Sequence, residues 1–436
     1  MFYATPFIEV FVVSKEAELI SCVTTFGAVL GLVLAIALIV HKIKPAYGLI
    51  CGALLGGIIG GASLADTVSA MIAGAQGMMS SVLRILTSGI LAGALIKSGS
   101  AERIAAAIVG KLGQRHAVVA IALATMLICA VGVFIDIAVI TVAPIALAVG
   151  QRAGLSKSGI LLAMIGGGKA GNIISPNPNT IAVSEAFKVV LTALMAQNIL
   201  PALGALVLTV CLARRLARRS DGLAYGDPSD TVKTPVLSLW RALAGPATVV
   251  ALLSLRPLVH LAFDPLVALP IGGLICIIVC GHWRRTAEFT EYGLSKVVDV
   301  SVLLVATGTL AGIIKESALQ GDMIALLQWF NLPTFALAPL SGLFMAAATA
   351  STTAGATIAS QTFAAPLMQA GVPALAAGAT IHAGATIADS LPHGSFFHAT
   401  GGAVYMDIGP RLRLIPYEML IGLASTVLSA LLYVWG

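Results

Sequence analysis

The feature that most constrains this chain is a series of apolar stretches, each about 15 to 25 residues long, separated by short basic clusters. An α-helix rises 1.5 Å per residue, so stretches of this length match a hydrocarbon core roughly 30 Å thick. Of the 436 residues, 58% are hydrophobic and 10% are charged, whereas a soluble domain carries about 25% charged residues. The composition excludes a soluble fold and predicts an all-α polytopic membrane protein.

The positive charges indicate how the chain is oriented in its membrane. The net charge is +6, but the basic residues do not form a patch with interleaved aromatic residues, so no nucleic-acid partner is predicted. Cytoplasmic loops are enriched in Lys and Arg, and we expect the basic clusters on that side of an inner membrane. These clusters lie within residues 41–44, 97–115, 152–157, 214–241, 284–296 and 411–413.

A path that keeps all six clusters cytoplasmic has about ten transmembrane helices and two re-entrant hairpins. The segment 117–150 is too long for one crossing and too short for two, so we expect a hairpin with its tip near Gly132. By the same argument 334–371 is a second hairpin that enters from the other face. Both termini are then predicted outside. The expected spans are 21–40, 46–64, 76–96, 158–180, 186–212, 243–263, 266–281, 298–314, 373–400 and 415–435.

The two halves of the chain resemble each other. We expect a first repeat at 1–219, a cytoplasmic linker at 220–240 and a second repeat at 241–436, with opposite orientations because the first starts outside and the second inside. Secondary transporters built from inverted repeats hold substrate at mid-membrane between discontinuous helices. The alternative is a chance similarity of Ala- and Gly-rich segments. The recurring features are 91–97 with 310–315, Pro144 with Pro366, and Pro176 with Pro392.

A first broken helix is predicted within 158–180, where residues 166–180 read GGGKAGNIISPNPNT. Gly and Pro cost about 1 and 3 kcal/mol each inside a helix, so we expect the backbone to open along this run. Opened helix ends favour an anion, and a buried lysine needs an acidic or anionic partner. Alternatively, the polar groups only cap the broken helix, with Lys169 paired to Asp136. The candidate substrate ligands are Lys169, Asn172, Ser175, Asn177, Asn179 and Thr180.

A second broken helix is predicted within 373–400, around a Pro-Gly break that contains His382, Asp389 and His393. These residues do not have the spacing of a helical metal-ligand pair, so no metal site is predicted. Because histidine titrates near pH 6.5, and burial can bring a carboxylic acid toward neutrality, we expect proton coupling at Asp389 and His393, with Asp136 and His382 as further candidates. The alternative is a satisfied His–Asp hydrogen bond. Ser390, His393 and Gly394 are also candidate substrate ligands.

The hairpin tips add an acid and a group of hydroxyls. Asp136 lies in the first tip, and Ser351, Thr352 and Thr353 lie in the second. Hydroxyl groups can bind a carboxylate without a charge, although small hydroxyl residues are also common packing residues in membrane helices. Arg84 and Arg256 lie within predicted spans, and we assign them no part in transport.

Other features of the chain point to no cofactor. The six cysteines lie in apolar spans without a CxxC pair, which indicates neither disulfides nor a thiolate metal site. The first twenty residues contain Glu16 and Glu18 and lack a basic region followed by a cleavage site, so we expect an uncleaved first span.

The segments 166–187 and 389–394 (DSLPHG), together with the two-hairpin inverted repeat, resemble the gluconate permease (GntP) family of the ion transporter superfamily. The resemblance implies proton-coupled import of gluconate-like hydroxy-acids by an elevator-type homodimer, with 175–180 and 390–394 as substrate loops. The sequence departs from the family pattern at Lys169, at Asn177, where the family has histidine, and at Gly394, where it has asparagine. The resemblance therefore leaves the transported acid open.

Secondary transport of a small organic anion with protons, or with sodium as the alternative ion, is the function that these features favour. A cation/proton antiporter of the same superfamily is the alternative, and it needs acids rather than a lysine at the cavity. No nucleophile–base–orienter set, P-loop or cofactor fingerprint appears, so an enzyme is not predicted. A channel fits less well, because hairpins from both faces suit alternating access.

Overall fold

The computed structural model describes residues 23–41, 43–113, 116–218, 237–259, 263–319, 322, 333–392 and 394–435, and these residues form helices without a β-sheet. The first half contains α1 (Thr25–Val40), α2 (Pro45–Ile59), α3 (Leu64–Gln76), α4 (Met79–Lys97), α5 (Ser100–Leu112), α6 (Ala117–Ala130), α7 (Ile135–Arg152), α8 (Lys157–Asn172), α9 (Pro178–Ala186), α10 (Leu191–Gln197) and α11 (Ile199–Ala217). The second contains α12 (Leu239–Val259), α13 (Pro265–Val279), α14 (Thr286–Lys315), α16 (Leu337–Thr349), α17 (Thr352–Gln369), α18 (Ala374–Ala385), α19 (Ser395–Ala403), α20 (Ile408–Leu412) and α21 (Ile415–Trp435), with two 3-10 turns, η2 (Trp283–Arg285) and η3 (Thr334–Ala336).

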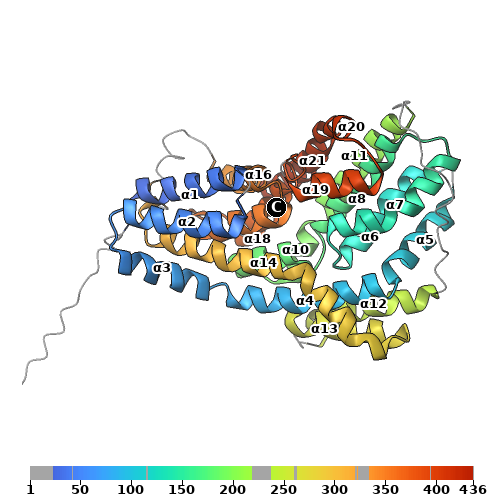
Figure 1. The fold of residues 1–436 in the computed structure, drawn as a ribbon, viewed down its shortest axis with the longest axis horizontal. Helices are drawn as coiled ribbons and strands as arrows, with labels where there is room; N and C mark the ends of the chain where they lie inside the picture. The colour runs from blue at the N-terminus through green and yellow to red at the C-terminus, as the bar shows by residue number, and fades with distance from the viewer. Residues whose placement is uncertain are drawn as a thin grey trace, which may run out of the picture.

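The helices enclose two hydrophobic cores. One core joins side chains of α5, α6, α7, α8 and α11, and the other joins side chains of α1, α2, α14, α16, α17 and α18. Figure 1 shows these groups toward opposite ends of the molecule, with α18, α19 and α21 between them and α4, α12 and α13 along one side. Helices far apart in the sequence therefore meet at the centre.

The long helix α14 packs against α3 and α4 through glycines. A Cβ atom on Gly74 would lie 2.1 Å from the Gly308 carbonyl oxygen, and one on Gly89 would lie 2.7 Å from that of Gly293. Any larger side chain would separate the backbones, so these glycines allow the close helix contact common in membrane proteins. Helix α14 starts at Thr286, twelve residues before the predicted span 298–314, and its first turns carry charged residues such as Glu288 and Glu291.

Both predicted hairpin segments are pairs of contacting helices. The α6–α7 pair turns at Gly132, which has φ +109°, and the α16–α17 pair turns at Ala350, which has φ 45°. Gly132 therefore lies at the expected tip, where its positive φ favours glycine. The re-entrant path of these pairs and the inverted orientation of the two halves stay predictions.

Five helices in the described part of the chain are long and apolar enough to cross a membrane, and a sixth is obtained if the bent pair α9–α10 is counted as one span. Seven further apolar helices are shorter. The ten predicted spans and the side on which each terminus lies stay predictions. The predicted span 186–212 contains two helices, α10 and α11, which are separated at Asn198, and the chain bends by 108° between α9 and α10 at its start. Most of the predicted linker, and residues 1–22, lie outside the described residues.

Candidate functional site

The first predicted break is present, but the glycine run is not where the backbone opens. Helix α8 continues through Gly166, Gly167, Gly168 and Gly171 and ends at Asn172. A Cβ atom on Gly167 would lie 2.1 Å from the Ala122 carbonyl oxygen, so this glycine admits the backbone of α6. The expectation of an unwound glycine run was therefore wrong, because close packing against α6 outweighs the low helix propensity of glycine.

The chain opens at residues 173–177, and the new helix start is capped by its own sequence. Asn177 is the N-cap of α9, and its side-chain oxygen accepts a hydrogen bond from the Thr180 N–H at 3.0 Å. Pro178 follows in the first turn, where its missing N–H has no cost. The Asn177 amide also donates to the Asn172 carbonyl oxygen at 2.9 Å. The two asparagines thereby tie the two half-helices together.

The second predicted break separates α18, which ends at Ala385, from α19, which starts at Ser395 with Gly394 as its N-cap. Asp389 lies inside this break and is buried. Its carboxylate accepts hydrogen bonds from the Thr352 hydroxyl at 2.6 Å and from the Ser390 hydroxyl at 2.9 Å. The second break is therefore linked to the hydroxyl-rich tip of the α16–α17 pair.

Lys169 joins the two breaks. Its Nζ lies 2.7 Å from Asp389 Oδ1, with the two side chains 1% and 2% exposed, and it donates to the carbonyl oxygens of Thr386 at 2.6 Å and Glu418 at 3.3 Å. The ammonium has three donors, and all three have partners. The buried lysine therefore has an acidic partner, as expected, but that partner is Asp389, and the alternative pairing with Asp136 was wrong.

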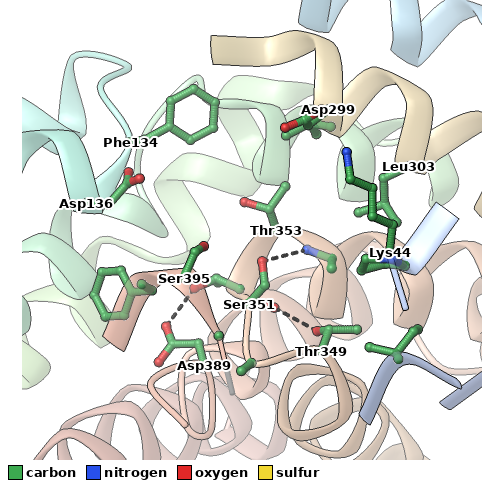
Figure 2. Close-up of a pocket in the computed structure, with 18 of the residues that line it drawn as sticks. Lys44, Phe134, Asp136, Asp299, Leu303, Thr349, Ser351, Thr353, Asp389 and Ser395 are labelled. Carbon is green, nitrogen blue, oxygen red and sulfur yellow. Dashed lines mark hydrogen bonds between the residues drawn. The ribbon is translucent and has the colours of Figure 1, made fainter. Parts of the chain in front are cut away.

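A cavity of about 1090 Å³ opens beside this pair. Figure 2 shows Asp136 and Asp299 on opposite sides of it, with Ser351 and Thr353 between them and Asp389 below. Of the residues proposed from the sequence, the cavity is lined by Asp136, Asn172, Asn179, Ser351, Thr352, Thr353, Asp389 and Gly394. The tips of both helix pairs and both breaks thus meet at one place.

Several helices begin at the cavity wall. The first residues of α7, α17 and α19 line it, and Asn179 brings the first turn of α9 to the same wall. Helix N-termini carry unpaired N–H groups and a partial positive charge, and they attract anions. The arrangement can therefore hold an anionic group without a dedicated cationic side chain.

Two buried polar atoms at the cavity have no partner within the described structure. The Asn172 Nδ2 donor and the Asn179 Oδ1 acceptor are unpaired, and both residues are 2% exposed and line the cavity. Buried polar groups are normally paired, and an unpaired one costs about 1 to 3 kcal/mol. A ligand that both accepts and donates hydrogen bonds, such as a hydroxyl group, would satisfy both atoms.

The remaining predicted residues lie away from the cavity wall. Ser175, Asn177, Thr180, Lys169 and Ser390 are buried around the two breaks without lining it. His382 is fully buried in α18, and neither of its ring nitrogens has a partner among the described residues. His393 lies outside the described residues, so its predicted roles stay predictions.

The charged residues on the other wall were not predicted as site residues from the sequence. Lys44 at the start of α2, and Lys296 and Asp299 on α14, line the cavity. Lys296 and Asp299 are three residues apart and therefore on one face of α14. A charged pair with this spacing at the edge of the predicted span 298–314 was the available signal. No group of three or more His, Cys, Asp or Glu side chains that could hold a metal ion occurs within the described ranges.

Known proteins with similar sequences show which family the chain belongs to. A family model described as "GntP family permease" matches residues 20–428 of this chain. The chain belongs to the GntP permease family. This confirms the resemblance drawn from the sequence, and it makes the protein a multi-pass membrane transporter.

Individual relatives cover the chain to different extents. An uncharacterized transporter of Haemophilus influenzae is 51% identical over 411 residues, which are 94% of this chain and 98% of that protein. The inner membrane permease YgbN of Escherichia coli is 32% identical over 125 residues, 28% of this chain and 27% of that protein. The YdaH transporter of Alcanivorax borkumensis, known from a crystal structure, aligns with a TM-score of 0.64 and 18% identity over 85% of this chain and 88% of that chain. This last similarity concerns the fold alone.

Proposed function

We propose that the protein is a secondary active transporter that carries a small organic anion together with protons across the inner membrane. The observation that supports this most is the cavity between the two broken helices, where several helix N-termini meet beside a buried Lys169–Asp389 pair. The anion would bind at the helix N-termini, which favour negative charge. The absence of an ATP-binding motif from the sequence is consistent with energy from an ion gradient.

The ion pair provides a physical route to coupling. With Asp389 ionised and Lys169 charged, the pair is neutral. If Asp389 takes up a proton, the positive charge of Lys169 is no longer balanced, and an anion in the adjacent cavity is bound more tightly. Linkage is reciprocal, so the bound anion also favours the proton. Proton and substrate would therefore bind together, as symport requires.

The substrate class that we propose is a hydroxy-acid, a sugar acid or a related carboxylate. The carboxylate would take the helix N-termini, and a hydroxyl group would satisfy the unpaired Asn172 Nδ2 and Asn179 Oδ1 atoms. We further propose an elevator-type movement in a homodimer, in which both breaks and both helix pairs move against α2 and α14. The position of the cavity between these two groups of helices supports this mechanism.

Uptake into proteoliposomes tests the proposal. Purified protein is reconstituted, and radiolabelled gluconate, other sugar acids, hydroxy-acids and amino acids are offered with and without an inward proton gradient. We expect the gradient to drive accumulation of at least one acid, and Asp389→Asn to abolish it. Accumulation that follows sodium and ignores the proton gradient would contradict proton coupling, and no accumulation of any acid would contradict the proposed substrate class.

Cation/proton antiport is the second candidate, because three aspartates, Asp136, Asp299 and Asp389, line the cavity. Lys44 and Lys296 line it too, which favours the anion. The same proteoliposomes distinguish the two functions when a pH-sensitive dye is enclosed. Proton movement that is triggered by sodium or potassium without any organic acid would favour antiport. Proton movement that requires an organic acid would favour symport.

A further inference from the structure

The two helices that follow the breaks are short. Helices α9 and α19 have nine residues each, and isolated helices below about 12 residues are barely stable. Each nevertheless brings residues to the cavity: Asn179 from α9, and Ser395 and Phe396 from α19. Their positions must therefore be fixed by contacts with the rest of the molecule.

Helix α9 is held near its C-terminal end by Arg84 of α4. The Arg84 guanidinium makes two parallel hydrogen bonds to Asp264, Nε to Oδ1 at 2.9 Å and Nη2 to Oδ2 at 2.6 Å. Its remaining nitrogen, Nη1, lies 2.7 Å from Glu185 Oε2 on α9, and Ser80 bridges the same arginine and glutamate. One guanidinium thus joins α9 to α4 and to the N-cap of α13.

Helix α19 is held in the same manner by Arg411, which lies in α20 and is 1% exposed. The Arg411 guanidinium forms a two-pronged pair with Glu418 of α21. Its Nη2 also donates to the Thr400 hydroxyl of α19 at 3.2 Å, and the guanidinium lies 4.8 Å from the centre of the Phe397 ring, also on α19. Arg411 belongs to a cluster predicted to be cytoplasmic, and its burial was not expected from the sequence.

We propose that Arg84 and Arg411 are positioning residues that form two arginine clamps, each fixing one short helix whose N-terminal end forms part of the substrate site. In both clamps a carboxylate outside the short helix holds the guanidinium with two hydrogen bonds, and a remaining N–H contacts the short helix. The planar, five-donor guanidinium is suited to this double role, and lysine is not. The inference about substrate affinity rests on the proposed function, but the positioning itself does not.

The two clamps differ in their exposure to solvent. The side chains of the Arg84 clamp are between 22% and 42% exposed, whereas those of the Arg411–Glu418 pair are 1% and 0% exposed. Exposed ion pairs are screened by salt and contribute little, whereas breaking a buried pair is strongly destabilising. The clamp on α9 is therefore the one that salt can weaken.

Hydrogen–deuterium exchange on the full-length protein in detergent tests the positioning. Thr400→Val removes the hydroxyl that Arg411 contacts, and Glu185→Met removes the carboxylate that Arg84 contacts. We expect amides of 395–403 to exchange about five- to tenfold faster in Thr400→Val, with 178–186 unchanged, and the reverse in Glu185→Met. The matched variants Thr400→Ser and Glu185→Gln keep an oxygen acceptor. Amides of the affected helix should exchange more slowly in them than in Thr400→Val and Glu185→Met. Faster exchange throughout the protein, or no change in either helix, would overturn the proposal.

Uptake of radiolabelled D-gluconate as the probe gives a second readout. Loss of a clamp misplaces the helix N-termini in the free protein, so we expect KM to rise several-fold while Vmax stays within about twofold. A fall in Vmax with unchanged KM would contradict positioning of the site. If the unaltered protein does not transport gluconate, the proposed function fails for this acid, and the exchange experiment still decides whether the clamps exist.

Discussion

At the scale of single residues, the pairing of Lys169 is the decisive feature of this protein. The charged side chain of a lysine that is 1% exposed is unfavourable without a partner, because removing a charge from water costs several kcal/mol. The chain meets this requirement with Asp389 and the Thr386 carbonyl group, both in the second break, and with the Glu418 carbonyl group of α21. The lysine therefore holds both breaks together in addition to any part it has in coupling.

Removing the ammonium should destabilise the folded protein strongly. We expect Lys169→Met to cost about 3 to 5 kcal/mol, because Asp389 is left as a buried charge without its cation. The double variant Lys169→Met with Asp389→Asn should recover part of this loss, because no unpaired charge remains. Thermal unfolding in detergent measures both, and Thr352→Val, which removes one hydrogen bond to the same carboxylate, is the control. A stable Lys169→Met protein would show that the pair does not support the fold.

Asp264 predicts a dependence of stability on pH. Hydrogen bonds from Arg84 lower the pKa of this carboxyl, which lies in the connection between α12 and α13. A carboxyl whose pKa is lower in the folded chain stabilises the fold above its unfolded pKa of about 4, and this contribution is lost as the pH falls through the folded value. Relative to Asp264→Asn, the unaltered protein should thus be more stable at pH 6, and the difference should shrink toward pH 3. Unfolding temperatures measured across this range check the sign, and a difference that is constant with pH would contradict it.

At the scale of elements, glycine acts on this fold through packing more than through flexibility. The run 166–168 was expected to open the helix, but α8 continues through it because α6, α7 and α11 pack directly against it. The helix ends instead where an asparagine cap and a proline start the next helix. Proline and capping residues decided the boundary, and glycine decided the distance between helices.

Alanine substitutions can separate these two roles of glycine. A Cβ atom at Gly171 would lie 2.2 Å from the Met126 carbonyl oxygen, whereas at Gly110 of α5 it would meet nothing within 4 Å. We expect Gly171→Ala to destabilise the protein by about 1 to 3 kcal/mol through overpacking. Gly110→Ala should be neutral or stabilising by up to about 1 kcal/mol, since alanine has the higher helix propensity. Equal effects at the two sites in thermal unfolding would show that packing does not explain the glycine run.

At the scale of the whole molecule, the cavity lies between the helices of the two breaks and two hairpin pairs and the helices α2 and α14. Residues of α7, α17 and α19 form one side, and residues of α2 and α14 form the other. Such a division allows one group of helices to move against the other, as alternating access requires.

Alternating access predicts that a cavity residue reacts from both sides of the membrane. Ser395 is exposed and lines the cavity (Figure 2), so Ser395→Cys is placed in a variant whose native cysteines are replaced by serine or alanine. We expect an impermeant maleimide to label it in both right-side-out and inside-out vesicles, with slower labelling in the presence of a transported acid. Lys111→Cys, at the exposed end of α5 in a basic cluster predicted to be cytoplasmic, is the control and should react from that side alone, independently of the acid. Labelling of Ser395→Cys from one side only would contradict alternating access.

The sequence by itself determined the helical membrane fold, the two breaks and the family. Apolar length, Pro-containing motifs and capping asparagines act locally, so they can be recognised without coordinates. Three properties were decided only by the tertiary structure: the partner of Lys169, the charged wall at Lys44, Lys296 and Asp299, and the arginine clamps at Arg84 and Arg411. Each joins residues separated along the chain, such as Lys169 and Asp389, or Arg84 and Asp264. A side chain's partner depends on which helices pack together, and that is set by glycine contacts and buried charges across the whole molecule rather than by any local pattern.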